Sequence, residues 1–378
     1  MAIRLVKRNP LHWWQRLMLP FGAVFLAVLF SSLFILLAGA NPIQAWLLII
    51  EGSMGSRFSF LETLVKMAPL SFCGLAVAVA FKAKFWNIGA EGQLYVGAFM
   101  AAWLGTLPLE GLGVLHIPLI IIFGFVGSGL FAMLPGLLKV RFKVDDVVST
   151  LLLNYIVIFL LGALLEGPWR DPVSGWPHSE RIASSAEFPT LLARSRLHLG
   201  ILLAFVAAVG VWFLFAKTTL GYRIKAVGEN IPAARFGGIS TPRAFLSACF
   251  ISGGLAGMAG VGEVCAVQYY VIEGISPGFG YFGIAVAMLG ALNPFGALLA
   301  AFFFAAVITG AQAMSRATGV PVYLAEMIQG ITLITMLFML MLDRYKIVFD
   351  RKKACGGDAN TTSGVLASLS SSSAASEV

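Results

Sequence analysis

The sequence has few charged residues. Asp, Glu, Lys and Arg together make up 12% of its 378 residues, whereas a soluble domain has about 25%. Hydrophobic residues make up 59%, and the mean hydropathy is +0.89. This composition excludes an ordinary soluble protein, and it leaves no room for a soluble domain of any size beside membrane-spanning segments.

Motifs that would support chemistry are also missing. The sequence has no GxxxxGK[ST] phosphate-binding loop, so any ATP must be handled by another polypeptide. It has no HExxH motif, and no paired carboxylates are expected at one depth, which argues against a membrane protease or metalloenzyme. The four cysteines form no CxxC pair and suggest neither a disulfide framework nor a zinc site. We therefore expect no enzyme, no metal site and no cofactor bound by this chain.

Long apolar runs bounded by charge, proline or glycine predict an all-α membrane protein with about ten transmembrane helices. About 20 residues suffice to cross the roughly 30 Å of hydrocarbon. The spans are expected at 17-40, 60-81, 85-105, 117-138, 147-166, 198-216, 244-262, 266-292, 295-313 and 322-342. The eighth contains Pro277, Gly278 and Gly280, so a short outer segment followed by a half-helix from Tyr281 to Leu292 is an equal alternative. A single permease domain over 17-342 follows.

The basic residues predict the orientation. Most of the 26 Lys and Arg residues fall in the N-terminal segment, in alternate loops and after the last span. Cytoplasmic loops carry this excess, so both termini are expected inside, with residues 1-16 as a basic N-terminus and 343-378 as a disordered tail. Lys66 and Arg196 are among the exceptions. The net charge of +8 suits anionic lipid headgroups, and we expect no nucleic-acid partner.

The first apolar run partly resembles a secretory signal, because Arg4, Lys7 and Arg8 precede it and Ala38-Gly39-Ala40 follows it. A signal has an apolar region of about 7-15 residues, whereas this run exceeds 20. Its length favours a retained helix.

The segment Asn87-Ile88-Gly89-Ala90-Glu91-Gly92-Gln93 places polar groups in an apolar run. A carboxylate near the middle of a transmembrane helix costs on the order of 3 kcal/mol, so it normally faces a bundle interior or a water-filled path. If the run is helical from Phe85, then Asn87, Glu91 and Tyr95 share one face and Gln93 points elsewhere. The segment indicates a polar route through a membrane.

Asn154 follows the Asp145-Asp146 pair of the fifth span. It lies about 12 Å from its inner boundary and Glu91 about 10 Å from its own, at 1.5 Å per residue, so the two side chains are expected at a similar depth and in reach of each other. Two interpretations are equally weighted. Asn154 either locks two helices by hydrogen bonding to Glu91 or to a backbone carbonyl, or it lines a substrate path.

A polar stretch from Thr218 to Ile239 interrupts the apolar runs. Asn230 is a suitable N-cap, Pro232 fits a first helical turn, and Gly237 or Gly238 can end the helix. From the residues alone, a short surface helix that only orders its own loop is the favoured interpretation.

Several motifs, in this order and spacing, resemble one known family over about residues 60 to 342. They are the Asn87-to-Gln93 segment, Leu153-Asn154-Tyr155-Ile156, Thr219-Leu220-Gly221, Gly228-Glu229-Asn230, Ala233-Ala234-Arg235, Gly237-Gly238-Ile239, Ser252-Gly253-Gly254-Leu255-Ala256-Gly257, the Gly283-to-Gly290 run and Asn293-Pro294-Phe295-Gly296. Together they resemble the permease subunits of the branched-chain amino acid, ribose and nucleoside group of ABC importers, most of all its nucleoside or simple-sugar branch.

The resemblance implies a type II ABC importer permease fold in a bacterial-type inner membrane. Two homologous permeases would pair as a heterodimer, and substrate would pass between them after delivery by an extracytoplasmic substrate-binding protein. ATP and Mg would be held by separate ABC ATPase subunits. The stretch 229-238 resembles the coupling helix, which gives as docking candidates Gly228, Glu229, Asn230, Ala233, Ala234, Arg235 and Gly237. The expected path or gate residues are Asn87, Glu91, Gln93, Tyr95, Asn154 and Tyr155.

Three functional hypotheses remain. The first is a permease that imports nucleosides, and the second is the same machine carrying ribose or another simple sugar. The third is a secondary transporter with Glu91 as its proton site, which the resemblance disfavours. Uptake that survives loss of the ATPase but collapses with the proton gradient would favour the third.

Overall fold

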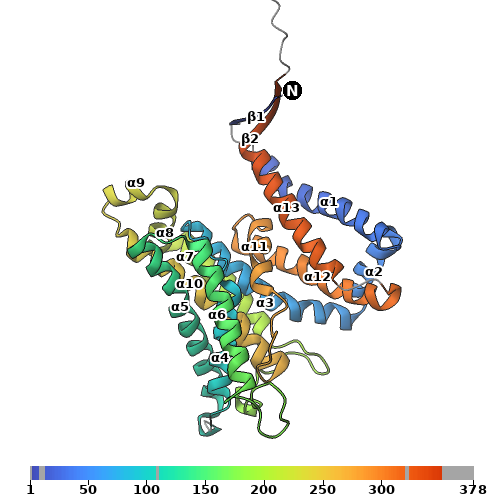
Figure 1. The fold of residues 1–378 in the computed structure, drawn as a ribbon, viewed down its shortest axis with the longest axis vertical. Helices are drawn as coiled ribbons and strands as arrows, with labels where there is room; N and C mark the ends of the chain where they lie inside the picture. Colours follow the sequence, from blue (N-terminus) through green and yellow to red (C-terminus); the bar gives the residue numbers. More distant parts are fainter. Residues whose placement is uncertain (1, 8–12, 108–109, 320–322, 351–378) are drawn as a thin grey trace, which may run out of the picture. The chain divides into compact units, whose positions relative to one another are not determined.

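The computed structural model describes residues 2–7, 13–107, 110–319 and 323–350 (Figure 1). The contacts divide the chain into two units, one formed by Trp13–Leu340 and one by the two flanking end segments. In the described part of the end segments, β1 (Ala2–Lys7) pairs antiparallel with β2 (Tyr345–Asp350), with Ala2 opposite Asp350. This differs from the expected disordered segment from residue 343, because Tyr, Ile, Val and Phe favour strands. Residues 351–378 lie outside the described part.

The larger unit is helical. Its α-helices of more than two turns are α1 (Trp13–Leu37), α2 (Pro42–Met54), α3 (Arg57–Lys82), α4 (Ala90–Gly105), α5 (His116–Phe142), α6 (Asp146–Glu166), α7 (Leu199–Lys217), α8 (Thr219–Glu229), α10 (Thr241–Gly262), α11 (Phe279–Leu289), α12 (Pro294–Thr318) and α13 (Leu324–Arg344). The short pieces are η1 (Glu110–Leu115), η2 (Ser184–Ala186), α9 (Ile231–Phe236) and η3 (Glu263–Gln268).

Seven helices in the described residues are long and apolar enough to cross a membrane. The ten predicted runs each contain a helix, but α4 and α11 are short, about 24 Å and 16 Å at 1.5 Å per residue. Neither reaches across about 30 Å of hydrocarbon alone. The half-helix alternative for the eighth run is confirmed, because irregular backbone from Tyr269 to Gly278 precedes α11.

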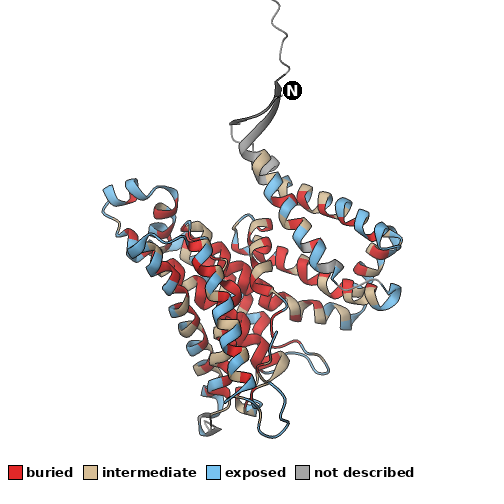
Figure 2. Ribbon diagram, in the orientation of Figure 1, coloured by how far each residue is buried: buried red, intermediate tan, exposed pale blue. Residues whose placement is uncertain are grey.

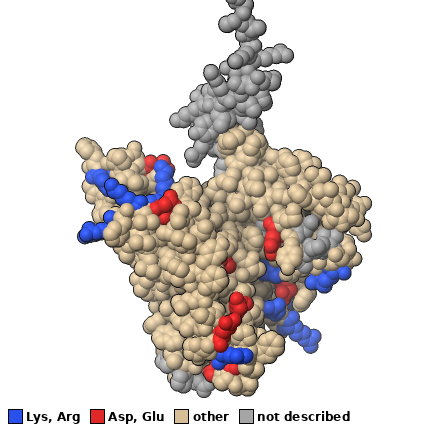
Figure 3. All heavy atoms as spheres, viewed as in Figure 1, with Lys and Arg blue, Asp and Glu red and all other residues tan. Residues whose placement is uncertain are grey.

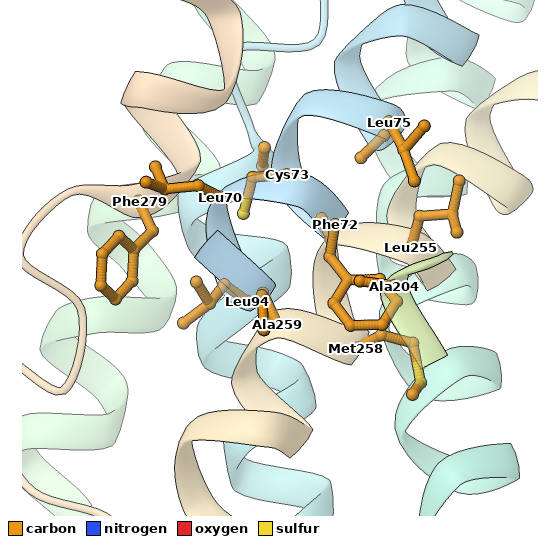
Figure 4. Packing of buried hydrophobic residues seen from close by; sticks show 14 of the residues in the cluster. Leu70, Phe72, Cys73, Leu75, Leu94, Ala204, Leu255, Met258, Ala259 and Phe279 are labelled. Carbon is orange, nitrogen blue, oxygen red and sulfur yellow. The ribbon is translucent and has the colours of Figure 1, made fainter. Parts of the chain in front are cut away.

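Two helices, α3 and α10, form the centre of the larger unit. Every residue from Met67 to Ala80 and from Ser252 to Gly262 is buried, as the red segments of Figure 2 show. The short helix α11 packs against α3, and the short helix α4 packs against α10. Figure 4 shows the resulting cluster, in which Leu70 and Cys73 of α3 lie with Leu94 of α4 and Ala259 of α10.

The outer helices turn apolar side chains outward. Phe25 of α1, Phe159 of α6 and Val206 of α7 are each about two-thirds exposed or more, at 68%, 71% and 66%. Such continuous apolar faces are unsuited to water and match a lipid surrounding. Together with the seven long apolar helices, they identify a multi-pass membrane protein.

Candidate functional site

The polar segment lies at a break between two helices. Helix α3 ends at Lys82, and α4 begins only at Ala90, so the predicted helix from Phe85 is wrong for its first turn. Lys84 has a positive φ of 54°, and the Asn87 Oδ1 atom accepts a hydrogen bond from Gly89 N at 3.0 Å. An asparagine that bonds its own backbone competes with the helix in this way. Asn87 therefore shares no helical face with Glu91 and Tyr95.

The side-chain amides of Asn87 and Gln93 pair with each other. Asn87 Nδ2 donates to Gln93 Oε1, and Gln93 Nε2 donates to Asn87 Oδ1, both at 2.9 Å. Asn87 Nδ2 also donates to Ser252 Oγ at 2.9 Å, and that hydroxyl donates to Ala76 O at 2.7 Å. All three side chains are buried. The predicted path residues Asn87 and Gln93 thus hold the break against α10 and α3, and neither faces an opening.

Asn154 of α6 holds the other side of the break. Its Oδ1 atom accepts from Gly92 N at 2.8 Å, and its Nδ2 atom donates to Ile88 O at 2.9 Å. Thr150 Oγ1 also accepts from Ile88 N at 3.3 Å. The helix-locking interpretation of Asn154 fits this geometry, although its partners are backbone atoms on either side of Glu91 rather than the carboxylate.

Glu91 binds the start of the second short helix. Its Oε2 atom accepts a hydrogen bond from Gly280 N at 2.6 Å, and the side chain is 2% exposed. Ser276 Oγ accepts from Phe279 N at 3.0 Å. A carboxylate is stabilised at a helix N-terminus, where N–H groups lack intrahelical partners. A Cβ atom at Gly280 would overlap the Glu91 backbone, so glycine is required for this approach.

Of the six predicted path residues, only Tyr155 reaches the surface, where it is 48% exposed. Tyr95 is buried. Tyr281 of α11 was not predicted, yet it is partly exposed and its hydroxyl accepts from Asn154 Nδ2 at 3.4 Å. The available signal was its place at the start of the alternative half-helix.

We expect Glu91→Ala to destabilise the protein and Glu91→Gln to be tolerated. Alanine leaves Gly280 N–H buried without an acceptor, at a cost of about 1–3 kcal/mol. Glutamine keeps an oxygen in the same place. The measurements are thermal unfolding of the purified protein in detergent and cellular uptake of radiolabelled nucleoside and sugar, the two expected substrates. Equal losses in both variants would contradict the capping role, whereas normal uptake by Glu91→Gln would also exclude Glu91 as a proton site.

A second group of charged side chains links α3, α12 and the loop before α7. Lys66 Nζ donates to Gln312 Oε1 at 2.6 Å, and Arg196 lies 3.5 Å from Glu62 Oε2. Glu263, 7% exposed, lies within electrostatic range of Lys66 and Arg196. Lys66 and Arg196 were exceptions to the predicted inner pattern, and their acidic and amide partners explain how these charges are accommodated.

Basic side chains gather at the end of the unit that carries α8 and α9. Lys84 Nζ donates to Glu229 O at 3.3 Å, and Lys139 Nζ bonds Lys84 O at 3.2 Å and Asp146 at 2.6 Å. Figure 3 shows Lys and Arg over α8 and α9 and a mostly uncharged surface beside them, over α5 and α6. Three segments that the sequence predicted to be cytoplasmic, those around Lys84, Lys139 and Glu229, therefore lie together at one end of the larger unit.

The predicted caps of α9 are confirmed. Asn230 Oδ1 accepts from Ala233 N at 3.1 Å, Pro232 lies in the first turn, and Gly238 follows with a φ of 74°. Among the docking candidates, Glu229, Asn230, Ala233, Arg235 and Gly237 are exposed, whereas Gly228 and Ala234 are buried within the chain. Phe236, which was not among the docking candidates, is 97% exposed at the end of α9.

The sequence matches the family described as "Branched-chain amino acid transport system / permease component" over residues 59–337. It is 33% identical to the guanosine ABC transporter permease protein NupP of Bacillus subtilis, over 91% of this chain and 99% of that protein. It is 31% identical to the nucleoside ABC transporter permease protein NupB of Lactococcus lactis, over 90% of this chain and 95% of that protein.

The glucose ABC transporter permease protein TsgB13 of Haloferax volcanii is 30% identical, over 94% of this chain and 98% of that protein. A second guanosine permease of B. subtilis, NupQ, is 26% identical over 64% of this chain and 78% of that protein. No solved structure matches the chain.

Proposed function

The chain belongs to the family of branched-chain amino acid transport system permease components, and from this premise we propose that it is the membrane-spanning subunit of an ABC importer for nucleosides. The observation that carries the proposal is the similarity, over nine-tenths of the chain, to permeases named for guanosine and nucleosides. The absence of a phosphate-binding loop from the sequence supports a separate ATPase that holds ATP and Mg.

The α8–α9 segment is the proposed contact with that ATPase. Ile231 and Phe236 of α9 are exposed apolar side chains, 48% and 97%, in an otherwise polar and basic region. Exposed apolar groups rimmed by polar ones are typical of protein interfaces. Arg235, also exposed, can pair with a carboxylate of the partner.

A second permease and an extracytoplasmic binding protein complete the proposed assembly. Bacillus subtilis has two guanosine permeases similar to this chain, NupP and NupQ, at clearly different identities. This supports a heterodimer of related permeases. The basic end with α8 and α9 would face the cytoplasm of a bacterial-type inner membrane, with both termini on that side.

Glucose is the second candidate substrate, because TsgB13 is also similar over nearly the whole chain. The buried polar side chains of Asn87, Glu91 and Asn154 form their hydrogen bonds with other groups of the protein and not with a substrate. These polar groups therefore do not distinguish a sugar from a nucleoside, and the choice between the two candidates depends on the relatives.

Deleting this chain is expected to abolish uptake of radiolabelled guanosine at micromolar concentration, and re-expression is expected to restore it. Uptake should depend on ATP and persist when the proton gradient is dissipated. Unlabelled uridine should compete, whereas glucose should not. Loss of glucose uptake with unchanged guanosine uptake would favour the second candidate and contradict the proposal.

A further inference from the structure

The loop that follows α6 lies at the end of the larger unit away from the basic segments. Asp146 begins α6 and is held at the basic end by Lys139. The helix then runs 21 residues to Glu166, about 31 Å at 1.5 Å per residue and enough to cross about 30 Å of hydrocarbon. Figure 1 shows α6 running away from α8 and α9. In the proposed orientation, the loop from Gly167 onward therefore meets the outer aqueous side.

Residues 171–178 of this loop, here called the outer turn, have a shape fixed by their own hydrogen bonds. Asp171 N donates to His178 O at 2.8 Å and closes the turn. The Asp171 carboxylate accepts from Val173 N at 3.3 Å and from Ser174 N at 2.8 Å, and Ser174 Oγ lies 3.0 Å from His178 Nε2. A turn that is already ordered loses little entropy when it binds a partner.

The outer turn stands on the irregular segment that precedes α11. Ser179 N donates to Val271 O, and Val271 N donates to Ser179 Oγ, both at 2.9 Å. Ile182 N donates to Tyr269 O at 2.9 Å, and the Arg181 guanidinium lies 4.8 Å from the centre of the Tyr269 ring. Because Ser179, Val271 and Ile182 are buried, the outer turn has a base that belongs to the core.

The outer turn presents apolar side chains to the outside. Val173 is 93% exposed and Trp176 is 70% exposed. An irregular turn is not placed in hydrocarbon, because its backbone polar groups would lose their contact with water. Tryptophan is enriched among the residues that contribute most to protein–protein binding. A rigid turn that carries an exposed tryptophan above the membrane is therefore suited to a protein partner.

The charge around the outer turn distinguishes a protein partner from a lipid surface. The chain has a net charge of +8, but the stretch 166–187 has four acidic and two basic residues, a net charge of −2. Anionic lipid headgroups attract basic segments and repel acidic ones. The exposed Glu180 next to the outer turn instead suits a protein surface with basic side chains.

We propose that the outer turn and Glu180 form the docking surface for the extracytoplasmic binding protein. Trp176 would enter an apolar recess of that protein, and Glu180 would pair with a basic side chain at the rim of the contact. The ATPase is the proposed partner of the opposite end, at α8 and α9. The docking surface rests on the proposed function, which it deepens by naming where this chain receives the loaded binding protein.

The test uses the complete transporter, with its ATPase and second permease, in lipid nanodiscs, together with its guanosine-loaded binding protein. The dissociation constant is measured for the wild type, Trp176→Ala and Glu180→Lys, and guanosine uptake is measured in cells. Trp176→Ala should weaken binding about tenfold or more, with a parallel loss of uptake at low concentration of the binding protein. Glu180→Lys should weaken binding about threefold and make it less sensitive to added salt.

Trp103→Ala is the matched control. Trp103 of α4 is 44% exposed, and it lies at the same end of the unit because Ala183 N bonds Gly105 O at the end of α4. Its replacement should leave the affinity for the binding protein unchanged. Since Trp176 and Glu180 are exposed, their replacement should alter neither the amount of assembled complex nor its thermal unfolding.

The outcomes separate the docking surface from the proposed function. If the wild type imports guanosine and both variants of the docking surface bind the binding protein as tightly as the wild type, the docking surface is wrong and the nucleoside importer stands. Equal losses of stability in Trp176→Ala and Trp103→Ala, with unchanged affinity, would make Trp176 a lipid anchor instead. If the wild type imports glucose and not guanosine, the proposed substrate fails, and the same affinities with the glucose-loaded binding protein decide the docking surface. Uptake that needs no binding protein would contradict both.

Discussion

Replacing Phe236 by aspartate is expected to lower nucleoside uptake about tenfold or more, with the permease itself intact. Phe236 is 97% exposed at the end of α9, and an aromatic side chain at the centre of an interface commonly contributes about 2 kcal/mol or more to binding. A carboxylate there would have to be desolvated against the ATPase. The measurements are uptake and copurification of the ATPase with a tagged permease.

The variant Phe236→Leu is the matched control for this substitution, because it keeps an apolar contact and should retain most of the uptake. Since Phe236 is almost fully exposed, neither change should alter the thermal unfolding of the isolated permease. Arg235→Glu tests the neighbouring charge and is expected to leave ATP hydrolysis running without uptake. Normal copurification and uptake by Phe236→Asp would show that α9 is not the docking element.

Replacing Gly97 by valine is expected to prevent correct folding. Gly97 of α4 faces Gly257 of α10 so closely that a Cβ atom would overlap the Gly257 carbonyl oxygen. Overpacking of a core typically costs about 1–3 kcal/mol. The cost should lie at or above the upper end here, because the opposing atoms are backbone and no side chain can rotate away. The measurement is the yield of monodisperse protein extracted from the membrane in detergent.

Gly210→Val provides the control for this effect. Gly210 also lies within a long apolar helix, α7, but a Cβ atom there would meet no atom within 4 Å beyond the adjoining backbone of its own helix. The yield of this variant should equal that of the wild type. If Gly97→Val and Gly210→Val gave the same yield, the close contact between α4 and α10 would be refuted.

The apolar runs predicted the helices well, because hydrocarbon admits few alternatives to a helix. The run 117-138 became α5, from His116 to Phe142, and the run 198-216 became α7. The break before Ala90 escaped prediction, although Asn87 bonds locally to Gly89 N. Part of what fixes the break is remote, because Asn154 bonds the Ile88 carbonyl 66 residues away and Gly92 N, in the first turn of α4, 62 residues away.

The site was predicted as a set of polar residues, with a backbone carbonyl as one possible partner of Asn154, and Ile88 supplies that carbonyl. The other partners were not predicted. Asn87, Glu91 and Asn154 are buried, as the cost of exposing them to lipid requires. Glu91 finds its donor at Gly280, 189 residues along the chain, and no local pattern joins two such positions. Tyr281 was not predicted for the same reason, because its hydroxyl bonds Asn154 of α6, which lies 127 residues earlier in the chain.

The close contact between Gly228 of α8 and the end of α3 limits how α8 can move. A Cβ atom there would overlap the Lys82 carbonyl oxygen, and next to it Lys84 holds the Glu229 carbonyl at 3.3 Å. The end of α8 is therefore clamped to the last turn of α3, only a few residues before Asn87. The break before Ala90 follows this contact directly, so α8 and α9 cannot move as a unit without either moving the break or losing the contacts of Gly228 and Lys84.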